Sequence, residues 1–542
     1  MDSKNFENKT KELIDNLKGI CANYGLGNDG NEFKIITQSF LYKFINDKFF
    51  FEIKKIDKKF DNSQNLEKIL SEMELKDYDL LLLRLPPDSV KLKKDHFLGT
   101  LYNQQNSNNF AKIFDDTFRN ISVLNNDIFS VKTNTGSKVI LFDELSTFIS
   151  DTSQRDDFCR AIINQMVNFN FENFFKLTFD FYSVIFEYLI QDYNKDGGDK
   201  YAEYYTPHSI SKVMADILVS RNVSNVSCYD PAAGSGTLLM SLAHKIGTDK
   251  CSIYSQDISQ KSSSMLRLNL IINNLVHSIQ NIVKGNTLLE PYHKENNKIK
   301  KFDYIVSNPP FKVDFSSYRN ELENKDNIER FFAGIPNITK KDKSQMSIYP
   351  LFLQHLLYSL SNKGCAAVVV PTGFVSDTKK IFQNIKKRIV DNKMLKAVVS
   401  MPGNIFANTP TNISILFIDK NLSKDEIVLI DASKKGYSEN SGKKKRTYLS
   451  PEDEELIVST VKNKKKIDKF SIVVSSDEIK EEDYSLSAMQ YFDQKIDFIE
   501  MSEKDFNYKV AKERDQLLKN FKENEKIKKD INDILKKFDE KL

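Results

Sequence analysis

The spacing of hydrophobic positions divides the chain into three regions. In residues 1–195 apolar side chains recur at helical spacing, which predicts a mostly helical N-terminal domain. The dense apolar run over residues 166–190 predicts a buried pair of helices, whose aromatic rings we interpret as core. The clearest positions are Phe33, Ile35, Ile36, Phe40 and Phe44, and later Phe174, Leu177, Phe181, Val184, Ile185 and Tyr188.

Residues 196–432 have a different pattern. Short runs rich in β-branched residues alternate with amphipathic helical segments, which predicts a parallel sheet with helices on its faces. Gly197 and Gly198 break the preceding helical pattern and mark the boundary. The expected strands cover residues 226–230, 252–257, 281–284, 303–307, 366–370, 397–401 and 413–418.

Residues 433–542 are rich in Lys and Glu, and we expect this region to be helical. Residues 506–542 place apolar side chains between charged ones, which predicts a long helix or helical hairpin with one apolar face. That face either packs on the chain's own core or docks on a partner subunit. Residues 443–446 form a basic run that we expect in a loop.

The composition suits a globular protein, with 40% hydrophobic and 28% charged residues among 542. The net charge is only +4, so any basic surface for nucleic acid must be local or supplied by a partner. No run reaches the roughly 18 apolar residues of a membrane span, and the first residues lack a signal-peptide core, so we expect a cytoplasmic location. The five scattered cysteines favour neither a disulfide framework nor a zinc site.

A glycine turn follows the first expected strand. It reads Asp230-Pro-Ala-Ala-Gly234-Ser235-Gly236, and such a turn lets backbone approach a ligand closely. Nicotinamide-binding folds also use a glycine turn, but their spacing is GxGxxG. The Asp230 carboxylate would repel a pyrophosphate, whereas it suits the ammonium and sulfonium groups of S-adenosylmethionine. The turn therefore predicts a site for that cofactor.

Two polar residues follow the next strands. Asp257 ends the second strand, where an acid can accept hydrogen bonds from ribose hydroxyls, and it can also cap the following helix. Asn286 follows the third strand, where its amide can pair with the adenine edge of the cofactor.

A third candidate segment precedes the glycine turn in the sequence. We expect a helix to begin in this segment and to end at Leu218. Threonine followed by proline is an ordinary helix start. In the functional interpretation the helix N-terminus receives the carboxylate of the cofactor. The segment consists of Glu203, Tyr204, Tyr205, Thr206, Pro207 and His208, and we assign no catalytic role to the histidine.

The most specific motif is the tetrad Asn308, Pro309, Pro310 and Phe311, which follows a mostly apolar strand. The lone pair of an exocyclic amino group is delocalised into its ring. The Asn308 side-chain oxygen and the Pro309 carbonyl can each accept one N–H of such a group and localise that lone pair. Phe311 can stack on the substrate ring. The tetrad predicts direct methyl transfer to an amino nitrogen, with catalysis by positioning and charge placement.

This chemistry restricts the substrate. A base inside a duplex must be flipped out to reach such a pocket. Methylation of cytosine at C5 would need a thiolate nucleophile, and none of the five cysteines follows a proline or a suitable strand end. The stretch 436–444 misses the spacing of a phosphate-binding loop, and no nuclease motif is evident.

The motifs, in this order, resemble the modification subunit of type I restriction-modification systems, in the N6-adenine DNA methylase family. The resemblance covers most of the chain. It includes residues 31–48, 181–192, 331–364 and 401–417 in addition to the motifs above. Asn286 stands where the family commonly has an acid, residues 55–158 match poorly, and the region around 344–347 also differs.

The resemblance implies the class I S-adenosylmethionine-dependent methyltransferase fold, a Rossmann-like, seven-stranded, mostly parallel sheet over residues 196–432. It implies that the upstream helix start, Gly234 to Gly236 and Asp257 contact the cofactor. It further implies double-stranded DNA as substrate, and a complex of two modification subunits with a specificity subunit, joined in some assemblies by restriction subunits.

Other enzymes use the same tetrad on glutamine amides in proteins or on amino groups in RNA. They usually lack the upstream helix motif and the large helical flanks. A non-catalytic subunit that kept the fold is a third class, which the intact tetrad disfavours. After the sheet only about 110 residues remain, mostly Lys/Glu-rich and expected to be helical, which leaves little room for a domain that reads DNA sequence. We therefore expect a separate specificity partner. The segment 312–343 is a candidate lid over the flipped base.

Overall fold

The computed structural model describes most of the chain, and its main compact unit is Met1–Tyr491, followed by a second unit, Phe492–Leu542. Among the described residues no helix is long and apolar enough to cross a membrane. The described residues are 3–27, 30–60, 65–133, 138–139, 141–172, 175, 188, 206–339, 342–406, 411–441, 444–492 and 501–539.

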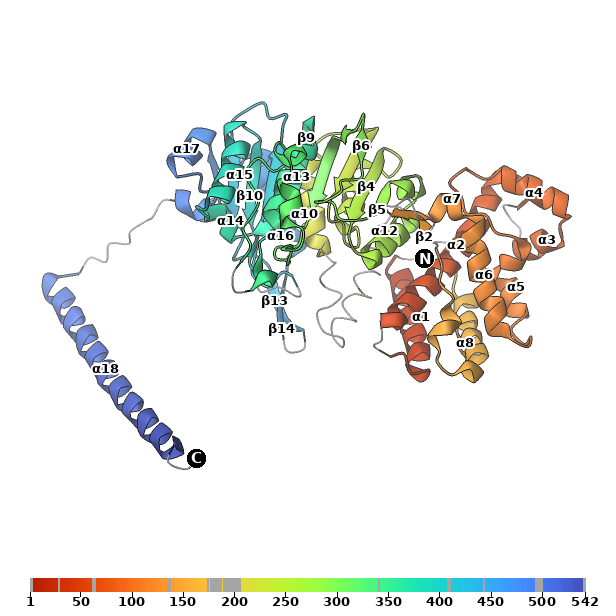
Figure 1. Cartoon of the computed structure of the whole chain (residues 1–542), viewed down its shortest axis with the longest axis horizontal. Coiled ribbons are helices and arrows are strands. Elements are labelled where there is room, and N and C mark those ends of the chain that lie inside the picture. The colour runs from red at the N-terminus through yellow and green to blue at the C-terminus, as the bar shows by residue number, and fades with distance from the viewer. Residues whose placement is uncertain are drawn as a thin grey trace. The chain divides into compact units, whose positions relative to one another are not determined.

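The centre of the first unit is a sheet with the order β15-β12-β10-β11-β9-β8-β3-β4-β5-β1-β2 (Figure 1). All seven strands expected from the sequence are present within it. They are β3 (Val226–Asp230), β4 (Cys251–Asp257), β5 (Ile282–Lys284), β8 (Phe302–Ser307), β9 (Leu360–Pro371), β10 (Leu395–Ser400) and β11 (Ile413–Asp419). Only β11 among the seven runs against its neighbours, β9 and β10. The expected seven-stranded, mostly parallel fold is confirmed.

Further strands extend this sheet at both edges, and the sequence pattern does not reveal them. On one side β12 (Ile427–Asp431) and β15 (Ser471–Val474) join β10. On the other side β1 (Val131–Thr133) and β2 (Lys138–Val139), which come from the N-terminal region, join β5. β1, β2 and β15 are two to four residues long, too short to show a clear period-two alternation.

Two small hairpins lie outside the main sheet. One pairs β6 (Lys294–Glu295) with β7 (Lys298–Ile299), and the other pairs β13 (Tyr437–Ser441) with β14 (Lys444–Tyr448). The second hairpin and β15 lie in the region expected to be helical. Residues 433–491 therefore combine strands with helices, and they belong to the same compact unit as the sheet.

Helices pack on the sheet as the alternating pattern predicts. Helix α10 contacts α11 and α16, while α13 contacts α15 and β9. The helices of this region are α10 (His208–Leu218), α11 (Thr237–Ile246), α12 (Gln260–Ile272), α13 (Tyr349–Ser359), α14 (Gly373–Ser376), α15 (Lys380–Asp391), α16 (Pro451–Asn463) and α17 (Ser476–Glu481).

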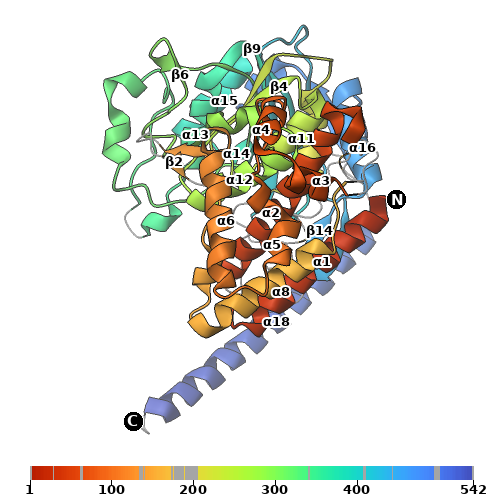
Figure 2. The same ribbon diagram turned by 90° about the vertical axis from the view of Figure 1, so that its right-hand side faces the viewer.

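The N-terminal region is helical, as expected, and Figure 2 looks onto it. Helix α8 packs against α1, α2, α5 and α6. The aromatic and aliphatic residues expected at helical spacing in α2, from Phe33 to Phe44, are buried. The expected helix pair over 166–190 lies largely outside the described residues. The helices are α1 (Ser3–Asn23), α2 (Gly30–Ile56), α3 (Leu66–Glu72), α4 (Leu75–Leu83), α5 (Leu98–Asn103), α6 (Phe110–Leu124), α7 (Asn126–Phe129) and α8 (Arg155–Val167).

The second unit contains one long helix, α18 (Glu503–Asp539). Its apolar side chains are at least half exposed within the structure. A helix of this length with so little buried apolar area gains almost none of the packing that stabilises helices in water. The exposed set is Phe506, Tyr508, Val510, Leu517, Leu518, Phe521, Ile527, Ile531, Ile534 and Leu535.

Candidate active site

The candidate site lies at one edge of the sheet. Strands β3, β4, β5 and β8 are parallel, so their carboxyl ends meet at the same edge. One candidate residue or motif lies at or just after each of these ends. They are Asp230 at the end of β3, Asp257 at the end of β4, Asn286 after β5 and the tetrad after β8. Open α/β sheets bind ligands at this edge.

The glycine turn joins β3 to α11 and requires glycine at its last position. Gly236 has φ +86°, a left-handed conformation that favours glycine, and a Cβ there would collide with Leu266 Cδ1 of α12. The Ser235 carbonyl accepts a hydrogen bond from Asn269 Nδ2 at 2.7 Å, which ties the turn to the same helix. Close packing of α11 and α12 therefore fixes the backbone of the turn.

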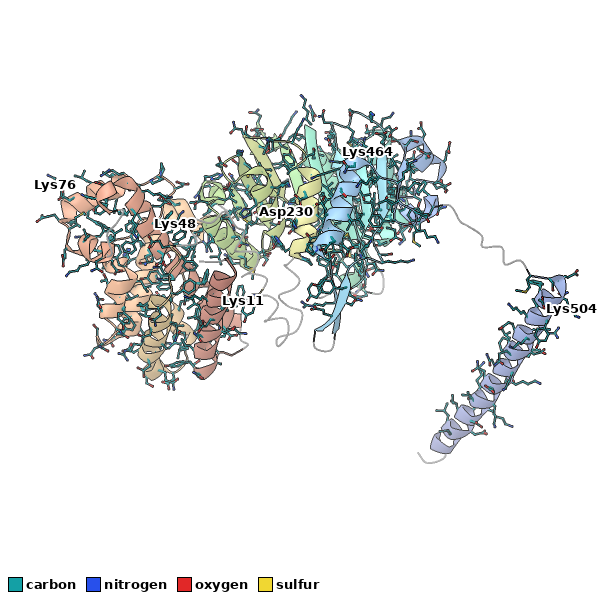
Figure 3. The ribbon with its side chains drawn as sticks, turned by 180° about the vertical axis from the view of Figure 1, so that it is seen from behind. Lys11, Lys48, Lys76, Asp230, Lys464 and Lys504 are labelled. Atoms are coloured by element: carbon teal, nitrogen blue, oxygen red, sulfur yellow. The ribbon has the colours of Figure 1, made fainter. Side chains whose placement is uncertain are left out.

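Asp230, labelled in Figure 3, is almost completely buried at the end of β3. Its Oδ1 accepts hydrogen bonds from the Ala232 backbone N–H and from Ser307 Oγ, both at 2.9 Å. Burial raises the pKa of Asp230 to about 7, although these two bonds oppose the shift. A cationic ligand group would restore the ordinary acidity of this carboxyl.

Asp257 holds the turn from the neighbouring strand. Its Oδ2 accepts the Gly234 N–H at 2.9 Å, and its Oδ1 accepts the Ser259 N–H at 2.8 Å. The N-cap of α12 is Ser259, whose hydroxyl accepts the Ser262 N–H. Burial raises the pKa of Asp257. Each carboxylate oxygen can accept a second hydrogen bond, so the helix-start contact leaves capacity for a ribose hydroxyl.

Asn286 shapes the turn after β5. Its Oδ1 accepts the Leu288 N–H at 3.0 Å, so the side chain is held within its own turn. The next residue, Thr287, donates from Oγ1 to the Pro231 carbonyl at 2.7 Å. Thr287 therefore connects the third-strand turn to the glycine turn, a role that no motif in the sequence marks.

The upstream motif is described only from Thr206 onward, so Glu203, Tyr204 and Tyr205 lie outside the described residues. Helix α10 begins at His208, with Pro207 as its N-cap residue, and ends at Leu218 as expected. The Nδ1 atom of His208 is buried and has no hydrogen-bond partner within the described part of the chain.

The upstream motif and the tetrad meet directly. Asn308 Nδ2 donates a hydrogen bond to Thr206 Oγ1 at 3.2 Å, although the two residues are 102 positions apart. An amide whose nitrogen is held in this way presents its oxygen to the remaining space. The hydrogen bond thus joins the first residue of the tetrad to a residue that the sequence pattern assigned to the cofactor.

The remaining tetrad residues differ in exposure. Pro309 is buried, Pro310 is exposed and Phe311 is half-buried. The Phe311 ring meets Tyr349 edge to face, with centroids 6.1 Å apart. The Phe311 carbonyl accepts the Ile348 N–H at 3.1 Å. The segment that follows the tetrad therefore ends beside the tetrad.

The candidate lid is a packed structure with its own apolar cluster. Phe315, Leu322, Phe331 and Met346 of this segment and its flank pack with Leu288, next to the third-strand turn. Tyr318 of the same segment hydrogen-bonds with the Asn286 side chain, although burial still raises its pKa. The segment thus lies against the turn that holds Asn286.

Arg330 anchors this segment from within. Its guanidinium is almost completely buried and donates to the carbonyls of Thr287 (2.7 Å) and Leu288 (2.8 Å). Its Nε also donates to His355 Nδ1 at 3.0 Å, and His355 Nε2 lies 3.2 Å from the Tyr229 hydroxyl. Burial lowers the pKa of Arg330 to about 10 and that of His355 well below its usual value. No sequence motif marks Arg330, because its burial depends on the folded segment around it.

Comparisons with known proteins agree with this geometry. The family model described as N-6 DNA Methylase matches residues 178–498, which is more than half of the chain. The type I restriction enzyme MpnII methylase subunit of Mycoplasma pneumoniae is 29% identical over 396 residues, 71% of this chain and 70% of that protein. The MjaVIII methylase subunit of Methanocaldococcus jannaschii is 25% identical over 471 residues, 85% of this chain and 75% of that protein.

Among solved structures, the chain resembles a type I restriction-modification system methyltransferase subunit from Streptococcus thermophilus. The TM-score is 0.70 at 19% identity, and the match covers 91% of this chain and 100% of the other. At that identity the likeness establishes a shared fold.

Proposed function

Because the chain belongs to the N-6 DNA methylase family, we propose that its site transfers a methyl group from S-adenosylmethionine to N6 of a flipped-out adenine, as the modification subunit of a type I restriction-modification system. The observation that carries this proposal is the hydrogen bond from Asn308 Nδ2 to Thr206 Oγ1, which occupies the nitrogen of the tetrad's amide and leaves its oxygen as the acceptor for the substrate. Methylase subunits of such systems are among the relatives found by sequence.

The residues at the strand ends fit S-adenosylmethionine. Asp230 is a buried carboxyl whose two hydrogen bonds come from neutral donors, and it suits an ammonium group. His208 Nδ1 is a buried nitrogen without a protein partner in the described chain, at the helix start expected to receive a carboxylate. Asp257 retains acceptor capacity for a ribose. When bound, this cofactor supplies the methyl group on its sulfonium.

Two acceptors of the chain act on the target amino group. Asn308 Oδ1 and the Pro309 carbonyl each accept one N–H, so that the nitrogen lone pair points toward the cofactor side of the site. Neither group changes its covalent bonding, the chain forms no covalent intermediate with the base, and the methylated nitrogen releases its surplus proton to solvent. Catalysis then rests on holding the nucleophile in line for attack. The half-buried Phe311 stacks on the flipped base and replaces the stacking lost from the duplex.

We further propose that α18 is a docking element for partner subunits. Its apolar side chains are exposed along the whole helix, with charged residues between them. Such a helix binds a complementary apolar face, as in a helical bundle. A specificity subunit and a second copy of the chain are the partners expected for this family. Leu517→Lys with Ile531→Lys should abolish co-elution with the specificity subunit and leave the thermal unfolding of Met1–Tyr491 unchanged.

Methylation of a glutamine amide or of RNA would use the same tetrad, and the relatives do not favour it. Single-molecule sequencing of host DNA should map N6-methyladenine in wild type and in Asn308→Ala. We expect one motif to lose its methylation in the variant. Asn421→Ala is a matched control, because the exposed Asn421 follows β11 at the opposite edge of the sheet. An unchanged map in Asn308→Ala would contradict the proposal, because the enzyme would then either be silent in that host or act on protein or RNA.

A further inference from the structure

The β13–β14 hairpin is a feature that the proposed chemistry does not use. Its two strands pair antiparallel with Tyr437 opposite Tyr448 and Ser441 opposite Lys444, and within the described part of the chain they form a separate two-stranded sheet. Figure 1 shows the hairpin projecting beyond the end of the main sheet. Residues 437–448 contain three lysines and one arginine against one glutamate, a net charge of +3 (4 − 1) in a chain whose total is +4.

The topology puts the base of this hairpin on the edge of the sheet that carries the active site. β12 is parallel to β10, and both are parallel to β9, β8 and β3 because β11 alone is reversed between them. Asp431 at the end of β12 therefore lies on the same edge as Asp230 and Ser307. The hairpin begins six residues after Asp431.

The base of the hairpin is fixed by hydrogen bonds. Gly436 N donates to Asp453 Oδ2 at 3.0 Å, and its φ of +82° favours glycine. Thr447 N donates to the Asn404 carbonyl at 3.1 Å, which joins the hairpin to the loop between β10 and β11. The Tyr437 and Tyr448 rings stack with centroids 5.8 Å apart. A fixed base gives the projecting strands a defined direction.

A short chain of interactions connects this base to the tetrad. Beside Asp453, Glu454 forms an ion pair with Lys212 of α10 at 2.7 Å. Lys212 lies in the second turn of α10, which begins at His208, two residues after Thr206. Thr206 in turn accepts the hydrogen bond from Asn308. The base of the hairpin is thus connected through α16 and α10 to the residue that holds the tetrad amide.

We propose that the β13–β14 hairpin, whose sequence carries a net charge of +3, is the element of this chain that contacts the phosphate backbone of duplex DNA beside the flipped adenine. Five-residue strands reach about 17 Å from their base, enough to meet a duplex whose base enters the site. Phosphate contacts position a protein on DNA without reading its sequence, which leaves reading to a separate subunit. This inference rests on the proposed function, because it takes DNA as the substrate.

The test measures binding of the full-length chain to a 30-base-pair duplex of random sequence at several salt concentrations. The slope of log K against log salt falls by about 0.9 for each phosphate that the protein no longer neutralises. We expect Lys444→Ala/Lys445→Ala/Arg446→Ala to reduce the slope by about 2 to 3 and to weaken binding roughly tenfold or more at low salt. Lys444→Arg/Lys445→Arg/Arg446→Lys should keep the wild-type slope.

A matched control removes three cations elsewhere. Lys462, Lys465 and Lys466 are exposed at the end of α16, near Lys464, which pairs with Glu426 just before β12 at the opposite edge. Their replacement by alanine should leave the slope unchanged. An unchanged slope in the hairpin variant would overturn the proposal, as would loss of subunit assembly with normal DNA binding, which would identify a protein contact. Failure of the proposed function is separate, because it appears as methylation that survives Asn308→Ala.

Discussion

Asn308 Nδ2 donates its hydrogen bond to Thr206 Oγ1 across 3.2 Å, and this contact joins the two halves of the active site. Thr206 opens the helix expected to receive the cofactor, and Asn308 opens the tetrad expected to receive the base. A side-chain amide has a donor end and an acceptor end of nearly equal size. In the structure the threonine hydroxyl accepts from the nitrogen end, which leaves the oxygen end for the substrate amino group of the proposed reaction.

Replacing Thr206 by valine should remove the hydrogen bond that holds the Asn308 amide. Valine keeps the shape of threonine but cannot accept the hydrogen bond, so the amide can turn its nitrogen toward the base. We expect kcat to fall roughly 10- to 100-fold, because a misplaced acceptor no longer aligns the nucleophile. The affinity for S-adenosylmethionine should change much less. Steady-state methylation kinetics and calorimetry give the two quantities, and Thr206→Ser should retain activity. Equal losses in Thr206→Val and Thr206→Ser would contradict the assigned role.

The carboxyl of Asp230 should make both stability and cofactor binding depend on pH near neutrality. Its pKa is raised to about 7, so the folded chain binds this proton more tightly than the unfolded chain does. Stability therefore falls as the pH rises from about 4 through about 7, and stays reduced above it. Asp230→Asn removes this cost, and should raise Tm relative to wild type at pH 8 but not at pH 4.

The same variant should lose cofactor affinity, because asparagine cannot pair with an ammonium group. In wild type we expect binding of S-adenosylmethionine to weaken as the pH falls below about 7, where the carboxyl is protonated. Isothermal titration from pH 6 to 8 measures this. A wild-type affinity that stays constant through this range would show that Asp230 does not receive the cation.

Features that depend on a short stretch of sequence could be predicted, whereas features that depend on residues far apart in the chain could not. The strands β3 and β8, the glycine turn and the tetrad are encoded within short runs, so periodicity and motif spacing predicted them. The contact between Asn308 and Thr206 spans 102 positions, and the burial of Arg330 requires the packed segment around it. Such long-range relationships leave no period or spacing in the sequence. The hairpin β13–β14 was missed because its polar residues resemble a basic loop.

The glycine turn offers a direct test of backbone conformation. Gly236→Ala adds a Cβ that collides with Leu266 and forces a left-handed conformation on alanine. We expect a loss of about 1–3 kcal/mol in the free energy of unfolding, together with weaker cofactor binding. Gly373→Ala is the control, because Gly373 starts α14 with open space around its Cβ position. Thermal and urea unfolding of both variants measure the difference, and similar stabilities would refute the packing argument.

Arg330 should act as a positioning residue for the turn that holds Asn286. Arg330→Met leaves the carbonyls of Thr287 and Leu288 without their buried donor, a loss of about 2–5 kcal/mol in the free energy of unfolding. Arg330→Lys keeps a cation but cannot reach both carbonyls and His355 in one plane. At a temperature where both variants remain folded, we expect the KM for S-adenosylmethionine to rise more than kcat falls, because the displaced turn is on the cofactor side.

The kinetic pattern separates this role from general loss of structure. Arg319 also lies in the segment after the tetrad, where it donates to the Pro336 carbonyl, and it pairs with Glu323 away from the turn. Arg319→Met should therefore lower stability without changing the KM for the cofactor. If both arginine variants raised that KM equally, the effect would belong to the whole segment, and the specific link from Arg330 to the Asn286 turn would be wrong.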